Sequence, residues 1–261
     1  MMVTTNNGDN VTIKIMADSI PQIGAETAPP GSPQWWAARP PVPVARVPKR
    51  GRPRRSFERI VDVAVDLVDE VGISAFNMRL LAERLNSSTA MLYRHVASKE
   101  ELMVFVVDRL LAEVAEDSEE ERPRTWQIAA RRSALRLHRA LTEHPNVLPA
   151  LVSHVPLGPN GLALRERTIG TLIGFGFSPE LAARAYTTIA QYIIGFAAVQ
   201  PNSPGPEEAA ALGDYYRALD PETYPRTVEA ADALTGIRLE EEFEQGLQFV
   251  LDGIDRARRR R

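Results

Sequence analysis

Cysteine and long apolar runs are both missing from this 261-residue sequence, and each absence excludes a class of protein. Without cysteine there is no disulfide, no thiolate zinc site and no cysteine nucleophile, and the composition fits a reducing compartment. Nowhere do about eighteen apolar residues follow one another, and the start lacks a basic stretch followed by an apolar segment. We therefore expect a cytoplasmic protein that is neither exported nor inserted in a membrane.

Glycine-rich phosphate loops, alternating strand patterns and internal repeats are also absent, and no cofactor motif is found, so no cofactor is predicted. The chain is 44% hydrophobic, and its length suits one small module followed by a larger one. A substantial packed core is therefore expected.

Residues 1–48 are rich in proline and show no sustained helical or strand period, so we expect a disordered Pro-rich arm. Its prolines are Pro21, Pro29, Pro30, Pro33, Pro40, Pro41, Pro43 and Pro48. Trp35 and Trp36 stand out, because a fully solvated tail rarely contains adjacent tryptophans. Two interpretations stay open for them, weakly packed aromatic side chains and a docking motif.

The net charge of −3 conceals two segments of opposite sign. Residues 49–99 carry ten Lys or Arg against six Asp or Glu, a net charge of +4, whereas residues 1–48 are balanced. The rest of the chain therefore carries −7. A small basic segment on a larger acidic body indicates a polyanion as the partner of the basic segment, although a solvated surface gives the same imbalance.

Apolar residues recur at three- and four-residue steps between Phe57 and Val68, which predicts an amphipathic helix. Gly72 is placed to end this helix, because only glycine adopts a left-handed conformation without steric cost. Asn77 is placed to cap a second, short helix over residues 78–85. The segment therefore begins as a pair of helices joined by a tight connection.

A third helix is predicted over residues 89–95, after the polar turn 86–88. Ser98 and Glu101 have the spacing of a capping box at the start of a long fourth helix. Further helical stripes occupy residues 125–143, 161–174, 179–199 and 237–256. The predicted fold class is therefore all-α.

The second and third helices, with the turn between them, have the geometry of a helix-turn-helix reader. Leu92 and Val96 are expected to hold the third helix to its module, which leaves small, hydroxyl and cationic side chains facing outward. The outward side chains are Thr89, Ala90, Met91, Tyr93 and Arg94. Hydroxyls reach phosphates or base edges, arginine pairs with guanine, and small apolar groups contact the thymine methyl. This chemistry suits the major groove of DNA.

The run Leu81–Leu85 (LAERL), the run Leu92–Val96 (LYRHV), then Lys99 and Leu102, resemble the DNA-binding module of the tetracycline repressor family. The resemblance implies a three-helix reader module followed by a larger helical domain. Asn86 stands where the family usually has glycine, and asparagine tolerates a left-handed turn residue fairly well. Ser87, which follows it, replaces a small apolar residue.

The resemblance also implies individual contacts with an operator. Tyr93 and Lys99 would contact phosphates, while Arg79 and Thr89 would lie at the operator. For His95 both a DNA contact and packing inside the module stay open.

A cationic run, Lys49–Arg55, precedes the first helix and resembles an AT-hook at its Arg-Gly-Arg-Pro centre. Arg50, Arg52 and Arg54 fit a narrow minor groove at A·T-rich flanks. A disordered basic arm bound loosely to phosphates is the alternative. We place the DNA-binding domain with this segment at residues 49–100.

The larger half, residues 101–256, resembles the effector-binding and dimerisation domain of the tetracycline repressor branch, and residues 257–261 form a basic tail. The resemblance is carried by His144-Pro145, by the run 156–160 (PLGPN) and by the run 176–180 (GFSPE) followed by Ala185-Tyr186. It implies a drug-sized pocket and a dimer built from helices near 179–199 and 237–256. The candidate interface residues are Ile189, Ile193, Phe243, Leu247 and Val250, with packing inside the chain as the alternative for each.

Magnesium-bound tetracycline is not expected as the effector. The family's namesake holds it with a histidine and an acid, and the corresponding positions here are Leu151 and, approximately, Val199. The candidate pocket residues, mostly apolar with a few polar groups, are Trp126, Leu137, Leu151, His154 and Tyr186. Core packing competes with this role for Trp126 and Leu137.

Two other functions compete. A metal enzyme would need His138, His144 and His154 as ligands, but their spacing lacks the i, i+4 pair that places two ligands on one helical face. A DNA-packaging protein would use the basic segment without any effector. We predict a ligand-responsive repressor that binds a palindromic double-stranded operator as a homodimer and is released by a small molecule.

Overall fold

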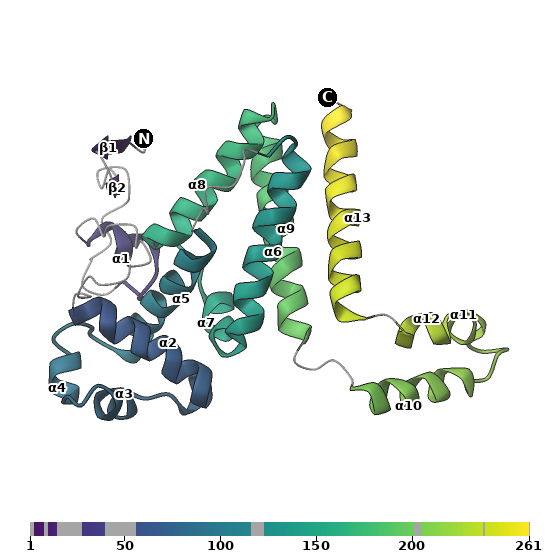
Figure 1. Ribbon diagram of the computed structural model, residues 1–261, viewed down its shortest axis with the longest axis horizontal. Helices are drawn as coiled ribbons and strands as arrows, with labels where there is room; N and C mark the ends of the chain where they lie inside the picture. Colours follow the sequence, from purple (N-terminus) through teal and green to yellow (C-terminus); the bar gives the residue numbers. More distant parts are fainter. Residues whose placement is uncertain are drawn as a thin grey trace. The chain divides into compact units, whose positions relative to one another are not determined.

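The computed structural model describes residues 3–7, 10–14, 28–39, 56–115, 123–200, 205–236 and 238–260 (Figure 1). Apart from a two-stranded antiparallel hairpin, β1 (Val3–Asn7) with β2 (Asn10–Lys14), its elements are helices. The all-α prediction is therefore confirmed. The cationic run with Arg50, Arg52 and Arg54 lies outside the described residues. The chain divides into two compact units, residues 1–186 and 187–261.

The first helices of the reader module begin and end where their residues predict. Helix α2 (Ser56–Ala75) is broken at Gly72, whose φ of 76° lies in the left-handed region. Helix α3 (Met78–Arg84) is capped by Asn77, whose Oδ1 accepts from the backbone N–H groups of Arg79 and Leu80, both at 3.1 Å. These local features orient α3 against α2 (Figure 1).

The turn after α3 is built by one left-handed residue and one cap. Asn86 has a φ of 50°, in agreement with the prediction that it can replace glycine there. The side chain of Ser88 then caps α4 (Thr89–Leu92) by accepting from the N–H of Met91 at 3.2 Å. Leu81, Leu92 and their apolar neighbours in the module are buried: Ile60, Val61, Ala64, Leu67, Val68, Phe76 and Val96.

Helix α5 (Lys99–Ala115) is the central element of the first unit and contacts α2, α6, α7 and α8. The surrounding elements are α6 (Trp126–Glu143), the short 3-10 turn η2 (Pro145–Val147), α7 (Leu148–Ser153), α8 (Pro159–Gly174) and the first part of α9 (Pro179–Val199). Helix α5 therefore belongs to both the reader module and the larger domain, so a displacement of α5 reaches both.

A short helix, α1 (Pro33–Ala37), lies within the stretch expected to be a disordered arm. Trp35 and Trp36 are 5% and 7% exposed, and their rings lie 5.7 and 5.8 Å from that of Phe105 on α5. Arg39 covers the face of Trp35 at 3.4 Å and forms an ion pair with the buried Glu101. Residues 28–39 thus differ from the disordered arm that was expected, because they have apolar and ionic partners on α5. Of the two interpretations of Trp35 and Trp36, docking is the one that fits these contacts.

The second unit contains the end of α9 with α10 (Pro206–Arg217), α11 (Pro225–Glu229), α12 (Ala231–Gly236) and α13 (Leu239–Arg259). Tyr192 and Phe196 pack on Phe243 with ring centroids 5.6 and 5.2 Å apart, and the hydroxyl of Tyr192 donates to the carbonyl of Phe243 at 2.9 Å. Helix α13 continues to Arg259, so most of the predicted basic tail is helical.

The residues predicted to form a dimer interface are mostly buried in the isolated chain. Ile189, Ile193, Phe243 and Leu247 are 6%, 2%, 1% and 0% exposed, whereas Val250 is partly exposed. Packing inside the chain, the alternative for each of them, therefore accounts for the first four. Among the described helices, none has the length and apolar character needed to cross a membrane.

Candidate DNA-binding and ligand-binding sites

The predicted reader ridge is exposed over a buried base. Leu92 and Val96 are 0% and 2% exposed, while Tyr93 is 52% exposed and Arg94 is also open to solvent. The regular helix is shorter than residues 89–95, but turn hydrogen bonds continue it, including His95 N–H to the carbonyl of Leu92 at 2.8 Å. Of the other ridge residues, Ala90 is exposed and Thr89 and Met91 are half-buried. The segment therefore has an exposed side and a buried side, as the sequence predicts, and contact with DNA stays a prediction.

Arg79 and Lys99, both predicted near the operator, have different surroundings. Arg79 is exposed and pairs with Glu83 one turn along α3, at 3.0 Å. The ammonium group of Lys99 instead donates to the carbonyls of Ile73 and Phe76, at 2.8 and 2.7 Å. Two of its three N–H groups therefore hold the end of α2. The sequence did not indicate this structural role for Lys99. One N–H remains for a phosphate.

His95 is packed against the reader module while it stays exposed on one side. Its ring stacks on Phe57 with centroids 6.2 Å apart, and Phe57 meets Phe105 edge-on at 4.9 Å. Packing therefore accounts for the orientation of the His95 ring. This aromatic row connects the end of α4 with α5.

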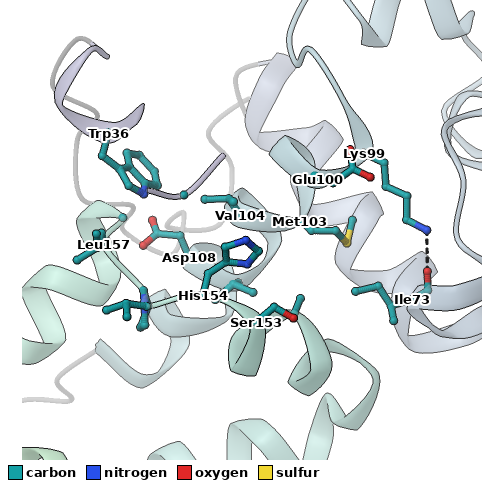
Figure 2. Close-up of a pocket in the computed structure, with 16 residues that line it drawn as sticks. Trp36, Ile73, Lys99, Glu100, Met103, Val104, Asp108, Ser153, His154 and Leu157 are labelled. Atoms are coloured by element: carbon teal, nitrogen blue, oxygen red, sulfur yellow. Dashed lines mark hydrogen bonds between the residues drawn. The ribbon is translucent and has the colours of Figure 1, made fainter. Parts of the chain in front are cut away.

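A pocket of about 250 Å³ lies beside α5 (Figure 2). Its walls come from α1, the start of α5, the end of α7 and the loop 154–158. The apolar lining includes Trp36, Met103, Val104, Val107 and Leu157, with Asp108, Ser153 and His154 as polar groups. A mostly apolar cavity with a few polar groups is the usual composition of a small-molecule site.

Only His154 among the predicted pocket residues lines this pocket. Trp126 is 2% exposed and meets Phe177 edge-on at 5.0 Å, and Leu137 is also buried, so core packing accounts for both. Leu151 is 4% exposed, and Tyr186 lies beneath the guanidinium of Arg165 at 5.7 Å. The sequence did not predict that α5 lines the pocket, because the apolar residues on that side of α5 have the spacing of core residues.

Asp108 is a buried carboxylate that closes the N-terminus of α8. It accepts from the backbone N–H groups of Asn160 and Gly161, at 3.1 and 3.0 Å, and from Nδ2 of Asn160 at 2.8 Å. Burial raises the pKa of Asp108 to about 6, against the lowering effect of these hydrogen bonds. Gly158 is needed beside it, because a Cβ there would lie 2.2 Å from Oδ1 of Asp108. The loop 154–158 and α5 are thereby held together.

His144 joins the reader module to the larger domain. Its Nδ1 lies 2.5 Å from Oδ2 of Asp69 on α2, and its Nε2 lies 3.4 Å from Oε2 of Glu113 on α5. The hydrogen bond to Glu113, followed by that to Asp69, outweighs desolvation and raises the pKa of His144 to about 9. The imidazolium is therefore the main form at neutral pH. Asn146 adds a hydrogen bond to the carbonyl of Asp69 at 2.8 Å.

Replacing His144 with glutamine should lower the free energy of unfolding by about 1–2 kcal/mol near pH 6.5, with allowance for solvent screening. The pKa is raised to about 9 from an ordinary 6.5, so the stabilisation is complete below about pH 6.5 and is lost as the pH rises through 9. Urea unfolding at pH 6.5 and 9.5 measures this. His154→Gln, at an exposed histidine, is the control. If His144→Gln lowers the free energy of unfolding by the same amount at both pH values, the ion-pair account is contradicted.

The three histidines of the metal-enzyme hypothesis do not gather into a site. Within the described ranges, no group of three or more His, Asp or Glu side chains is placed to hold a metal ion. His144 is engaged with two carboxylates, and His154 lines the pocket instead.

Comparison with known families covers both halves of the chain. The model described as "Bacterial regulatory proteins, tetR family" matches residues 60–104. The model described as "Tetracyclin repressor-like, C-terminal domain" matches residues 119–258, more than half of the chain.

Individual proteins show the same similarity. An HTH-type transcriptional regulator from Saccharopolyspora erythraea is 31% identical over 78% of this chain and 86% of its own. The HTH-type transcriptional repressor DrrR1 from Streptomyces coeruleorubidus is 28% identical over 80% of this chain and 81% of its own. Among solved structures, apo ActR from Streptomyces coelicolor has a TM-score of 0.70 and 31% identity, and the match covers 78% of this chain and 96% of ActR.

Proposed function

Because the chain belongs to the tetR family of bacterial regulatory proteins, with a tetracycline-repressor-like C-terminal domain, we propose that it represses transcription from a palindromic operator as a ligand-responsive homodimer. The chain is a DNA-binding transcriptional regulator and not an enzyme. The observation that carries the proposal is the exposed ridge of Tyr93 and Arg94 over the buried Leu92 and Val96.

On DNA, each subunit places α4 in the major groove. The two readers of a symmetric dimer then meet half-sites about one helical turn apart, on the order of 34 Å. Thr89, Tyr93 and Lys99 provide hydroxyl and ammonium donors for phosphates, and Arg94 provides a paired donor for guanine. Arg79 lies at the edge of this surface.

Exposed apolar surface on α13 and at the end of α9 supports a dimer. Phe249 and Val199 are 66% and 65% exposed, and Val250 beside Phe249 is partly exposed. A second copy of the chain is the partner expected for such surface in a symmetric regulator. Val250 remains a proposed interface residue, with Phe249 beside it.

A small molecule would release the operator by preferring a subunit arrangement with the wrong separation of readers. It can shift the equilibrium only by its differential affinity for the two arrangements. Structures of ActR in complex with actinorhodin and with (S)-DNPA, each with a TM-score of 0.71 to this chain, support a small-molecule effector. The position of Leu151, which cannot bind a metal, argues against magnesium-bound tetracycline.

Selection of bound sequences from a random DNA pool by the purified full chain tests the proposal. We expect an inverted repeat to be enriched, with half-sites about one helical turn apart. Sedimentation of the protein with the selected duplex should give two chains for each duplex. Binding without enrichment of any sequence would contradict the proposal and would favour a DNA-packaging role.

A further inference from the structure

Trp36 brings a hydrogen-bond donor to the pocket beside α5. It is 7% exposed and lines the pocket, and its indole Nε1 is buried without a hydrogen-bond partner among the described residues. An unpaired buried N–H is costly, so such groups usually have a protein, water or ligand partner. Trp36 lines the pocket, so a ligand oxygen bound there would supply the missing acceptor.

Asp108 supplies the complementary acceptor at the same pocket. Figure 2 shows the nitrogen edge of the Trp36 ring turned toward the carboxylate of Asp108. Three N–H groups of Asn160 and Gly161 already donate to this carboxylate. A carboxylate has about four acceptor positions, so Asp108 retains capacity for one more donor.

The rest of the pocket favours a small apolar molecule. Met103, Val104, Val107 and Leu157 line it together with the Trp36 ring. The volume of about 250 Å³ lies just below the range of about 300–1,000 Å³ typical for ligand pockets, which suits a ligand of two or three fused rings. The ammonium group of Lys99, although it lines the pocket, is held by the carbonyls of Ile73 and Phe76.

We propose that this pocket binds a hydroxylated aromatic effector, whose hydroxyl oxygen accepts from Nε1 of Trp36 while its O–H donates to Asp108. The N-terminal helix α1 is then part of the effector site. This inference rests on the proposed function, because it names the ligand chemistry of the regulator.

The same tryptophan is connected to the reader through packed rings. Trp36 contacts Phe105, Phe105 contacts Phe57, and Phe57 stacks on His95 at the end of α4. A ligand that engages Trp36 acts on a row of side chains that ends at the DNA-binding ridge. Occupancy of the pocket should therefore alter operator affinity through α1 and α5.

Calorimetric titration of the full chain with 2-naphthol and with 2-methylnaphthalene tests the proposal, because the two probes differ only by a hydroxyl in place of a methyl group. The wild type should bind 2-naphthol about a hundredfold more tightly, the ratio expected for two net hydrogen bonds. Trp36→Phe, which removes one of these bonds but keeps a ring, should lower this preference about tenfold. Trp35→Phe is the matched control, because Trp35 does not line the pocket.

The outcomes separate this inference from the proposed function. Absence of 2-naphthol binding by the wild type, or an unchanged preference in Trp36→Phe, would overturn the inference. Operator selection by the same preparations without a probe tests DNA recognition alone, so a failure there concerns the proposed function. If Trp36→Phe and Trp35→Phe have equal melting temperatures, any difference in their binding comes from the lost N–H group of Trp36 and not from a loss of stability.

Discussion

Arg94→Ala should weaken binding to the selected operator by about 1–3 kcal/mol, roughly fivefold to 150-fold, and should relax the preference at one base pair of each half-site. Arg94 is exposed on a ridge whose base is fixed by Leu92, which is fully buried. Truncation beyond Cβ should therefore remove the proposed base contact without disturbing the fold. Fluorescence anisotropy with the operator and with single-base variants of it measures both effects.

Arg124→Ala is the control for this experiment, because Arg124 is an exposed arginine next to the start of α6 and outside the reader module. It should leave both affinity and preference unchanged. An Arg94→Ala variant that binds every operator variant with the wild-type pattern would show that Arg94 does not read a base.

The reader module was predictable because its determinants are local. The break at Gly72, the cap at Asn77 and the left-handed residue Asn86 each act within a few residues of their position in the chain. Helical spacing then separates the buried Leu92 and Val96 from the exposed Tyr93 and Arg94 residue by residue. Neither step depends on distant parts of the chain.

Helix α1 was not predictable in the same way. Its surroundings in the sequence are rich in proline, and the ring that covers Trp35 and Trp36 belongs to Phe105, about seventy residues away. A proline-rich composition indicates only that such a segment cannot bury enough apolar surface by itself. The adjacent tryptophans were the one signal that it has a partner.

The pocket and the proposed dimer surface depend on tertiary packing. Apolar stripes on α9 and α13 led to the prediction of Ile193 and Phe243 as interface residues, and both are buried within the chain itself. A stripe does not tell a partner chain from the chain's own core. In the same way, Met103 on α5 belongs to a helical stripe yet lines a cavity. Of the five residues predicted to line a pocket, only His154 lines this cavity.

Lys99→Met should lower the free energy of unfolding by about 2 kcal/mol, because it removes two charge-assisted hydrogen bonds and leaves the carbonyls of Ile73 and Phe76 without their partner. Methionine preserves most of the apolar stem. Urea unfolding measures the loss, with Arg124→Ala as the control for removal of a positive charge.

The same Lys99→Met variant should also weaken all operator sequences alike and reduce the slope of log affinity against log salt concentration by about 1, because a phosphate contact carries no base preference. Anisotropy titrations at several salt concentrations, carried out below the unfolding transition, provide the slope. A lower stability with an unchanged slope would contradict the phosphate contact and restrict Lys99 to holding the end of α2. An unchanged stability with a reduced slope would instead show that its bonds to Ile73 and Phe76 add little to the stability of the fold.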